Sequence, residues 1–240
     1  MHEAPQPPPD LADTGGFMLA FIVGMAGLGA EVVYLKALDF SVGAAPAVRL
    51  TVVATFIVGM GLGAMFSARV RRPWLAEGVA AAWALGWLVG FETIVAANGA
   101  VLSTLAPTLG PDLAAALIGA GHLVVPAVAL GIALPAIIET EADLGRVYAH
   151  HALGAVVGIA LFEAIVYPTF GLPGAWALLV GAHFVALWLW LQRRRQRPLS
   201  ALRLGRPPLR LMAAGVATGG TQGAWLLVGA LLFRPYYFVG

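Results

Sequence analysis

The sequence predicts an all-α integral membrane protein built as a bundle of about seven transmembrane helices. Of its 240 residues, 60% are hydrophobic and only 11% are charged, whereas a soluble domain carries about 25% charged residues. A chain this apolar cannot cover its surface with polar groups in water, so we expect lipid to surround most of it. The 30 glycines fit this expectation, since small residues let membrane helices approach closely.

A helix needs about 20 residues to cross the ~30 Å hydrocarbon core of a bilayer. Seven apolar stretches of the chain approach or exceed this length, and each is bounded by polar residues, glycine or proline. In chain order they are Gly16–Leu38, Val48–Ala68, Trp74–Ala97, Leu113–Ile138, Val147–Tyr167, Gly174–Leu191 and Leu211–Phe233.

The predicted organisation has four parts. Residues 1–14 form a polar, acidic tail in which four prolines oppose helix formation, and we interpret it as a disordered cytoplasmic arm rather than a secretory signal. Residues 15–192 form a six-helix membrane domain. Residues 193–210 form a basic cytoplasmic loop, and residues 211–240 hold the seventh helix.

The positions of the basic residues predict the orientation, because cytoplasmic loops are enriched in lysine and arginine. With the spans above, eleven of the 14 basic residues fall on one side of the membrane, and only Lys36, Arg49 and Arg234 fall on the other. The N-terminus is therefore predicted inside and the C-terminus outside. The eleven are Arg69, Arg71, Arg72, Arg146, Arg193, Arg194, Arg195, Arg197, Arg203, Arg206 and Arg210.

A weak internal repeat relates the first helix to the last. Residues 24–35 align with residues 215–226 at a constant offset, so that Glu31 corresponds to Gln222 and Tyr34 to Trp225. Either the seventh helix opens a second copy of the domain that then stops, or two glycine- and alanine-rich helices coincide by chance.

Three stretches resemble the membrane domain of bacterial spermidine synthase-like proteins, in which several helices precede a soluble aminopropyltransferase-like domain. They are the glycine, glutamate, aromatic and basic pattern of residues 27–36, the glycine-rich residues 56–63, and the series from Gly131 through Gly145, Tyr148 and Gly158 to Leu172. The resemblance covers residues 16–190 and implies a bacterial inner-membrane location.

The chain departs from the family pattern in two respects. His150 and His151 replace the residues that commonly follow Tyr-Ala, and Glu163 replaces a small residue. We also find no glycine-rich strand-to-helix turn with a following acidic residue, which a nucleotide site would need. Aminopropyl transfer by this chain alone is therefore not expected, and the chain is not predicted to be an enzyme.

Ionisable side chains inside membrane helices are expensive and indicate function by default. Glu31, Glu92 and Glu163 are predicted at similar depths on the first, third and fifth helices, on the order of 7–10 Å below the outer surface at ~1.5 Å per residue. Together they could line a site for a proton or a small cation such as a polyamine. The alternative is three unrelated carboxyl groups, each hydrogen-bonded to a neighbouring helix.

His122 and His183 are predicted at equal depth on the fourth and sixth helices, as a bis-imidazole haem would require. The alternative is that each histidine hydrogen-bonds between helices. No other cofactor or metal is expected, and the sequence contains no cysteine that could serve as a thiolate ligand.

The cluster of Arg193, Arg194, Arg195 and Arg197 is interpreted as an anchor for anionic lipid headgroups at the cytoplasmic face. Nucleic acid binding has no support beyond charge. The expected partners are the lipid bilayer and other membrane subunits.

These observations favour a non-catalytic membrane subunit, a scaffold or accessory protein packed within a larger complex. A first alternative is a small-cation transporter or sensor that uses the three glutamates. A second is a haem-binding electron-transfer subunit.

Overall fold

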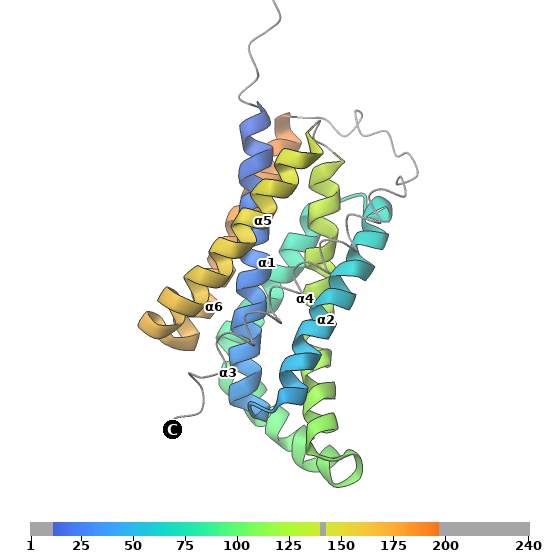
Figure 1. Cartoon of the computed structure of the whole chain (residues 1–240), viewed down its shortest axis with the longest axis vertical. Coiled ribbons are helices and arrows are strands. Elements are labelled where there is room, and N and C mark those ends of the chain that lie inside the picture. The colour runs from blue at the N-terminus through green and yellow to red at the C-terminus, as the bar shows by residue number, and fades with distance from the viewer. Residues whose placement is uncertain (1–11, 140–142, 197–240) are drawn as a thin grey trace, which may run out of the picture.

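A computed structural model of the chain describes residues 12–139 and 143–196. Every element in these ranges is helical, and five stretches are long and apolar enough to cross a membrane. Figure 1 shows them as a bundle elongated along one axis. The elements are α1 (Ala12–Val42), α2 (Pro46–Phe66), the short η1 (Ser67–Arg69), α3 (Trp74–Leu109), α4 (Pro111–Ile138), α5 (Leu144–Leu161), the π-helical turn η2 (Phe162–Val166) and α6 (Tyr167–Gln196).

The helix ends differ most from the predicted spans at the end of α3. The sequence predicted an end at Ala97, whereas α3 continues for three more turns to Leu109. Asn98, which is typical of helix ends, is instead buried, and its amide nitrogen donates a hydrogen bond to the Ser41 hydroxyl of α1. A tertiary partner therefore replaces the expected helix stop. The predicted seventh span lies outside the described residues.

The last apolar stretch, Leu144–Arg194, has 51 residues. As one straight helix it would extend for about 76 Å at ~1.5 Å per residue, far beyond the ~30 Å of a bilayer core. Instead the chain folds back at Gly171, whose positive φ of 64° favours glycine. Figure 1 shows α5 running towards this turn and α6 returning beside it. The turn lies between the two helices that the sequence predicted here.

Helix α1 is the centre of the bundle. In its most apolar window 67% of the residues are buried, against 22% to 50% in the other four candidate spans. It packs most extensively on α5 and α6 and also contacts α2, α3 and α4. Any side chain on the inner face of α1 is therefore far from the lipid surface of the bundle.

Two pairs of helices pack backbone to backbone through glycine. A Cβ atom at Gly63 of α2 would overlap the Val128 carbonyl of α4, and one at Gly131 would overlap Met60. We call this contact the α2–α4 seam. Helix α5 meets α1 in the same way, since a Cβ at Gly154 would overlap the carbonyl of Phe21. Such close approach requires the small residues that membrane helices use at their interfaces.

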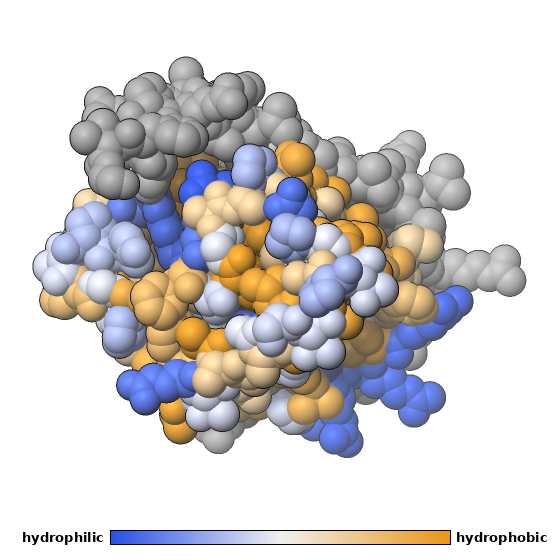
Figure 2. Space-filling view, turned by 90° about the horizontal axis from the view of Figure 1, so that it is seen from below, coloured by the Kyte–Doolittle hydropathy of each residue, from blue (hydrophilic) through white to orange (hydrophobic). Residues whose placement is uncertain are grey.

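The outside of the bundle is apolar. Large hydrophobic side chains such as Phe40, Leu50 and Val89 are 63% to 80% exposed, which suits a surface covered by lipid. Figure 2 looks onto the lower end of the bundle and shows hydrophobic residues there, with hydrophilic ones gathered in a few clusters near the rim.

Candidate functional site

Glu31 lies at the centre of the bundle. It is on the central helix α1, it is 1% exposed, and its Oε1 atom has no hydrogen-bond partner among the described residues. A buried carboxylate without a partner costs several kcal/mol in a low-dielectric interior. Such a group therefore either carries a proton or needs a cation beside it.

One turn further along α1, Tyr34 is enclosed by aromatic rings. Its ring meets Trp176 of α6 edge-on at 4.8 Å and Trp87 of α3 at 6.1 Å, and Phe56 of α2 lies 6.3 Å away. The two indoles stack on each other at 5.4 Å. The Tyr34 hydroxyl and the Trp176 Nε1 are buried and, like Glu31 Oε1, have no hydrogen-bond partner in the part of the chain that the structure describes. Several polar atoms with unused hydrogen-bonding capacity thus lie in one part of the core.

Helices α3 and α6 are joined by a buried contact between Glu77 and His183, which is an ion pair when the histidine is protonated. His183 Nδ1 lies 3.0 Å from Glu77 Oε2, and both residues are 1% exposed. The second carboxyl oxygen of Glu77 has no hydrogen-bond partner.

The order of these groups along the bundle follows from the helix registers. His183 lies two turns after Trp176 on α6, and Glu77 lies ten residues before Trp87 on α3, so the ion pair is about 10–15 Å above the aromatic rings at ~1.5 Å per residue. Glu31 precedes Tyr34 by one turn on the same face of α1, which places it at a level between the two. We call these six residues the polar core. They are Glu31, Tyr34, Glu77, Trp87, Trp176 and His183.

A hydrogen-bonded chain continues below the polar core. The ring of His122 on α4 meets Trp87 at 4.8 Å. Its Nε2 lies 2.8 Å from Asn98 Oδ1, and Asn98 donates to the Ser41 hydroxyl at 3.2 Å. Polar side chains thus extend from one end of the membrane span to the other, interrupted at mid-depth by the indole rings.

Glu163 lies on the π-helical turn η2 and forms an ion pair with Lys36 of α1 at 2.9 Å. The Lys36 ammonium also lies 5.1 Å from the centroid of the Tyr167 ring. A π-helical turn adds one residue to a helix and is frequent at functional sites. Here it bears the carboxylate that faces Lys36.

Glu92 of α3 is exposed on the surface of the bundle. The structure therefore does not gather the three predicted carboxyl groups at one point. Glu31 is in the polar core, Glu163 pairs with Lys36, and Glu92 faces outward.

The two histidines considered as haem ligands have different surroundings. His183 pairs with Glu77, whereas His122 pairs with Asn98, and these two partners are 21 residues apart on α3. That separation corresponds to about 31 Å of helix, so the two histidines bind partners at different levels of α3. Within the described residues, no group of three or more metal-ligating side chains could hold an ion.

The predicted arginine anchor is described only in part. Arg193 is buried, and the Arg194 guanidinium lies 5.9 Å from the Trp74 ring at the start of α3. Arg197 lies outside the described residues, as do residues 198–240.

Sequence reasoning did not single out Glu77. Its position in the first turn of a helix, beside the basic residues of the preceding loop, is typical of an interfacial residue. A signal in the sequence could have pointed to it. Ala76, Ala80 and Ala84 form a stripe of small residues beside Glu77, and such a stripe predicts close packing on another helix.

The described residues form an all-helical bundle with five stretches suited to a membrane and a hydrophobic core that encloses a few polar side chains. No known protein family, curated protein or solved structure matches the chain. The resemblance to the spermidine synthase-like membrane domain stays a prediction.

Proposed function

We propose that this chain is a multi-pass protein of the bacterial inner membrane that binds a proton or a small cation at Glu31 and acts as a cation-linked transporter or sensor. The observation that carries the proposal is the carboxyl group of Glu31, which lies on the central helix with no hydrogen-bond partner for Oε1. Intramembrane carboxyl groups of this kind occur in proton relays and ion pathways.

The surroundings of Glu31 support the same function. Glu77 and His183 lie towards one end of the bundle, and the side chain of each has an atom that can bind a proton. Tyr34 and its neighbouring indoles lie on the other side and offer ring faces that attract a cation. Groups for accepting a proton and for stabilising a positive charge therefore flank the same carboxyl group.

The proposed topology has the N-terminus of α1 on the cytoplasmic side. In that orientation the Glu77–His183 pair is nearer the cytoplasm, and the chain from His122 to Ser41 is nearer the outside. The eleven basic residues on the predicted inner side support this choice.

Infrared titration of the protein reconstituted in vesicles tests proton binding. We expect the carbonyl band of a buried protonated carboxyl group in the unmodified protein and in Glu92→Gln, which changes an exposed carboxyl group. The band should be lost in Glu31→Gln. A spectrum of Glu31→Gln identical to that of the unmodified protein would sink the proposal.

Flux measurements then separate transport from sensing. With a pH-sensitive dye inside the vesicles and an imposed membrane potential, a transporter conducts protons or takes up a polyamine in a way that Glu31→Gln abolishes. A sensor shows the infrared change without flux.

A second proposal, compatible with the first, is that the protein is an accessory subunit of a larger membrane complex. The supporting observation is the low burial of α2 and α3, with 28% and 22% of their apolar windows inside the bundle. Extraction in a gentle detergent should leave other membrane polypeptides bound. A monodisperse monomer under these conditions contradicts this second proposal.

A further inference from the structure

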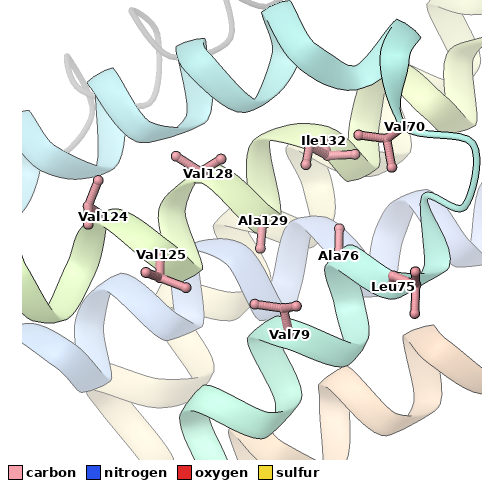
Figure 3. Close-up of a pocket in the computed structure, with 9 residues that line it drawn as sticks. All are labelled: Val70, Leu75, Ala76, Val79, Val124, Val125, Val128, Ala129 and Ile132. Carbon is pink, nitrogen blue, oxygen red and sulfur yellow. The ribbon is translucent and has the colours of Figure 1, made fainter.

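An apolar groove of about 440 Å³ runs along the outside of the bundle between α3 and α4 (Figure 3). Its walls carry only hydrophobic side chains, and several of them are 38% to 45% exposed, among them Leu75, Val79 and Val125. The lining residues are Val70, Leu75, Ala76, Val79, Val124, Val125, Val128, Ala129 and Ile132.

The groove exists because α2 and α3 both pack on α4 but not to any extent on each other. Helix α4 forms the floor, α3 forms one wall, and Val70, in the connection from α2 to α3, closes one end (Figure 3). From Ile132 to Val124 the floor extends for about 12 Å, or two turns of helix. A second helix laid along this floor would contact both α3 and α4.

The described chain ends near one end of this groove. Arg194, two residues before the end of α6, lies over Trp74, and Trp74 directly precedes the groove residues Leu75 and Ala76. The next apolar stretch in the sequence, Leu211–Phe233, begins after the 14 residues 197–210. Fully extended, such a linker reaches at most about 46–50 Å, which exceeds the ~12 Å length of the groove floor.

We propose that Leu211–Phe233 returns into the membrane as a helix and packs in this groove. The segment carries Gly215, Gly219 and Gly223, and residues spaced by four lie along one face of a helix. A glycine face of this kind approaches a neighbouring helix closely. It complements a groove whose walls are mostly valine and whose centre is formed by Ala76 and Ala129.

The chain contains no cysteine, so disulfide formation between two introduced cysteines tests the contact directly. One pair is Val79→Cys with Thr218→Cys, which puts the second thiol beside the glycine face. Its control is Val79→Cys with Ala217→Cys, on the opposite face of the same helix turn. We expect several-fold more intrachain disulfide in the first pair after mild oxidation in native membranes, measured by mass spectrometry of the linked peptides.

A second cysteine pair, deeper in the groove, controls for a local folding defect caused by the first pair. Val125→Cys with Gln222→Cys should also cross-link, and Val125→Cys with Ala224→Cys should not. Equal yields from facing and control pairs would overturn the proposal, as would the absence of any cross-link, which indicates that lipid fills the groove. Covalent dimers in place of intrachain links would also overturn it, because a second copy would then be the occupant. The test is independent of any cation binding at Glu31.

Discussion

The α2–α4 seam and the polar core are both fully buried, yet they are built from opposite chemistry. In the seam, Gly59, Gly63 and Gly131 bring two backbones together, and none of these residues has a polar side chain. In the polar core, α1, α3 and α6 are held apart by indoles and by ionisable groups. Close packing is enough to explain the seam. A buried carboxyl group whose oxygen has no hydrogen-bond partner costs free energy, so packing alone does not explain the presence of Glu31. The comparison therefore explains the first region by packing and makes the second region the candidate functional site.

The largest effect should follow from breaking the buried ion pair. His183→Leu removes the partner of Glu77 at 3.0 Å and leaves a carboxyl group alone in the core. Removing one partner of a buried pair typically costs about 3–5 kcal/mol, so we expect a clear loss of thermal stability in detergent, measured by circular dichroism.

The double variant Glu77→Leu with His183→Leu is the matched control. It removes both charged groups, and we expect it to be more stable than His183→Leu alone because no unpaired group remains. If the single variant is as stable as the double variant, the two residues do not interact, and the ion pair is not part of the polar core.

A smaller effect is expected from overfilling the seam. In Gly63→Ala the new methyl group would overlap the Val128 carbonyl, and overpacking typically costs about 1–3 kcal/mol. Gly61 lies on the same helix, and a methyl group added there would meet nothing within 4 Å, so Gly61→Ala should leave stability unchanged. Unfolding in increasing concentrations of a denaturing detergent measures both variants, and equal stability of the two would contradict the seam.

Features that depend on neighbouring residues in the sequence could be predicted, whereas contacts between residues far apart in the sequence could not. The helical character of the chain and the position of Glu31 within an apolar helix could be predicted, because hydropathy is a property of each stretch by itself. The pairing of Glu77 with His183 joins residues 106 positions apart, and the pairing of Glu163 with Lys36 joins residues 127 positions apart. Such contacts depend on how the helices pack, so equal predicted depth was not enough to bring three glutamates or two histidines together.

Helix ends show the same limit on a smaller scale. The predicted third span ended at Ala97, just before Asn98 and Gly99, two residue types that favour helix ends. The helix continues because His122 and Ser41 satisfy the Asn98 side chain within the bundle. A local preference worth less than about 1 kcal/mol per residue is easily outweighed by a tertiary contact.

The smallest expected effect tests whether this lower chain belongs with the polar core or with the packing. Asn98→Ala removes two side-chain hydrogen bonds, to His122 at 2.8 Å and to Ser41 at 3.2 Å. Interhelical hydrogen bonds in membrane proteins average about 0.6 kcal/mol each, so the expected loss is about 1 kcal/mol. Ser103→Ala is the control, because its hydroxyl is exposed and bonds only to a carbonyl of its own helix. If Asn98→Ala also loses proton binding, the polar core extends to the lower end of the bundle. If its infrared spectra are unchanged, the polar core is confined to its six residues.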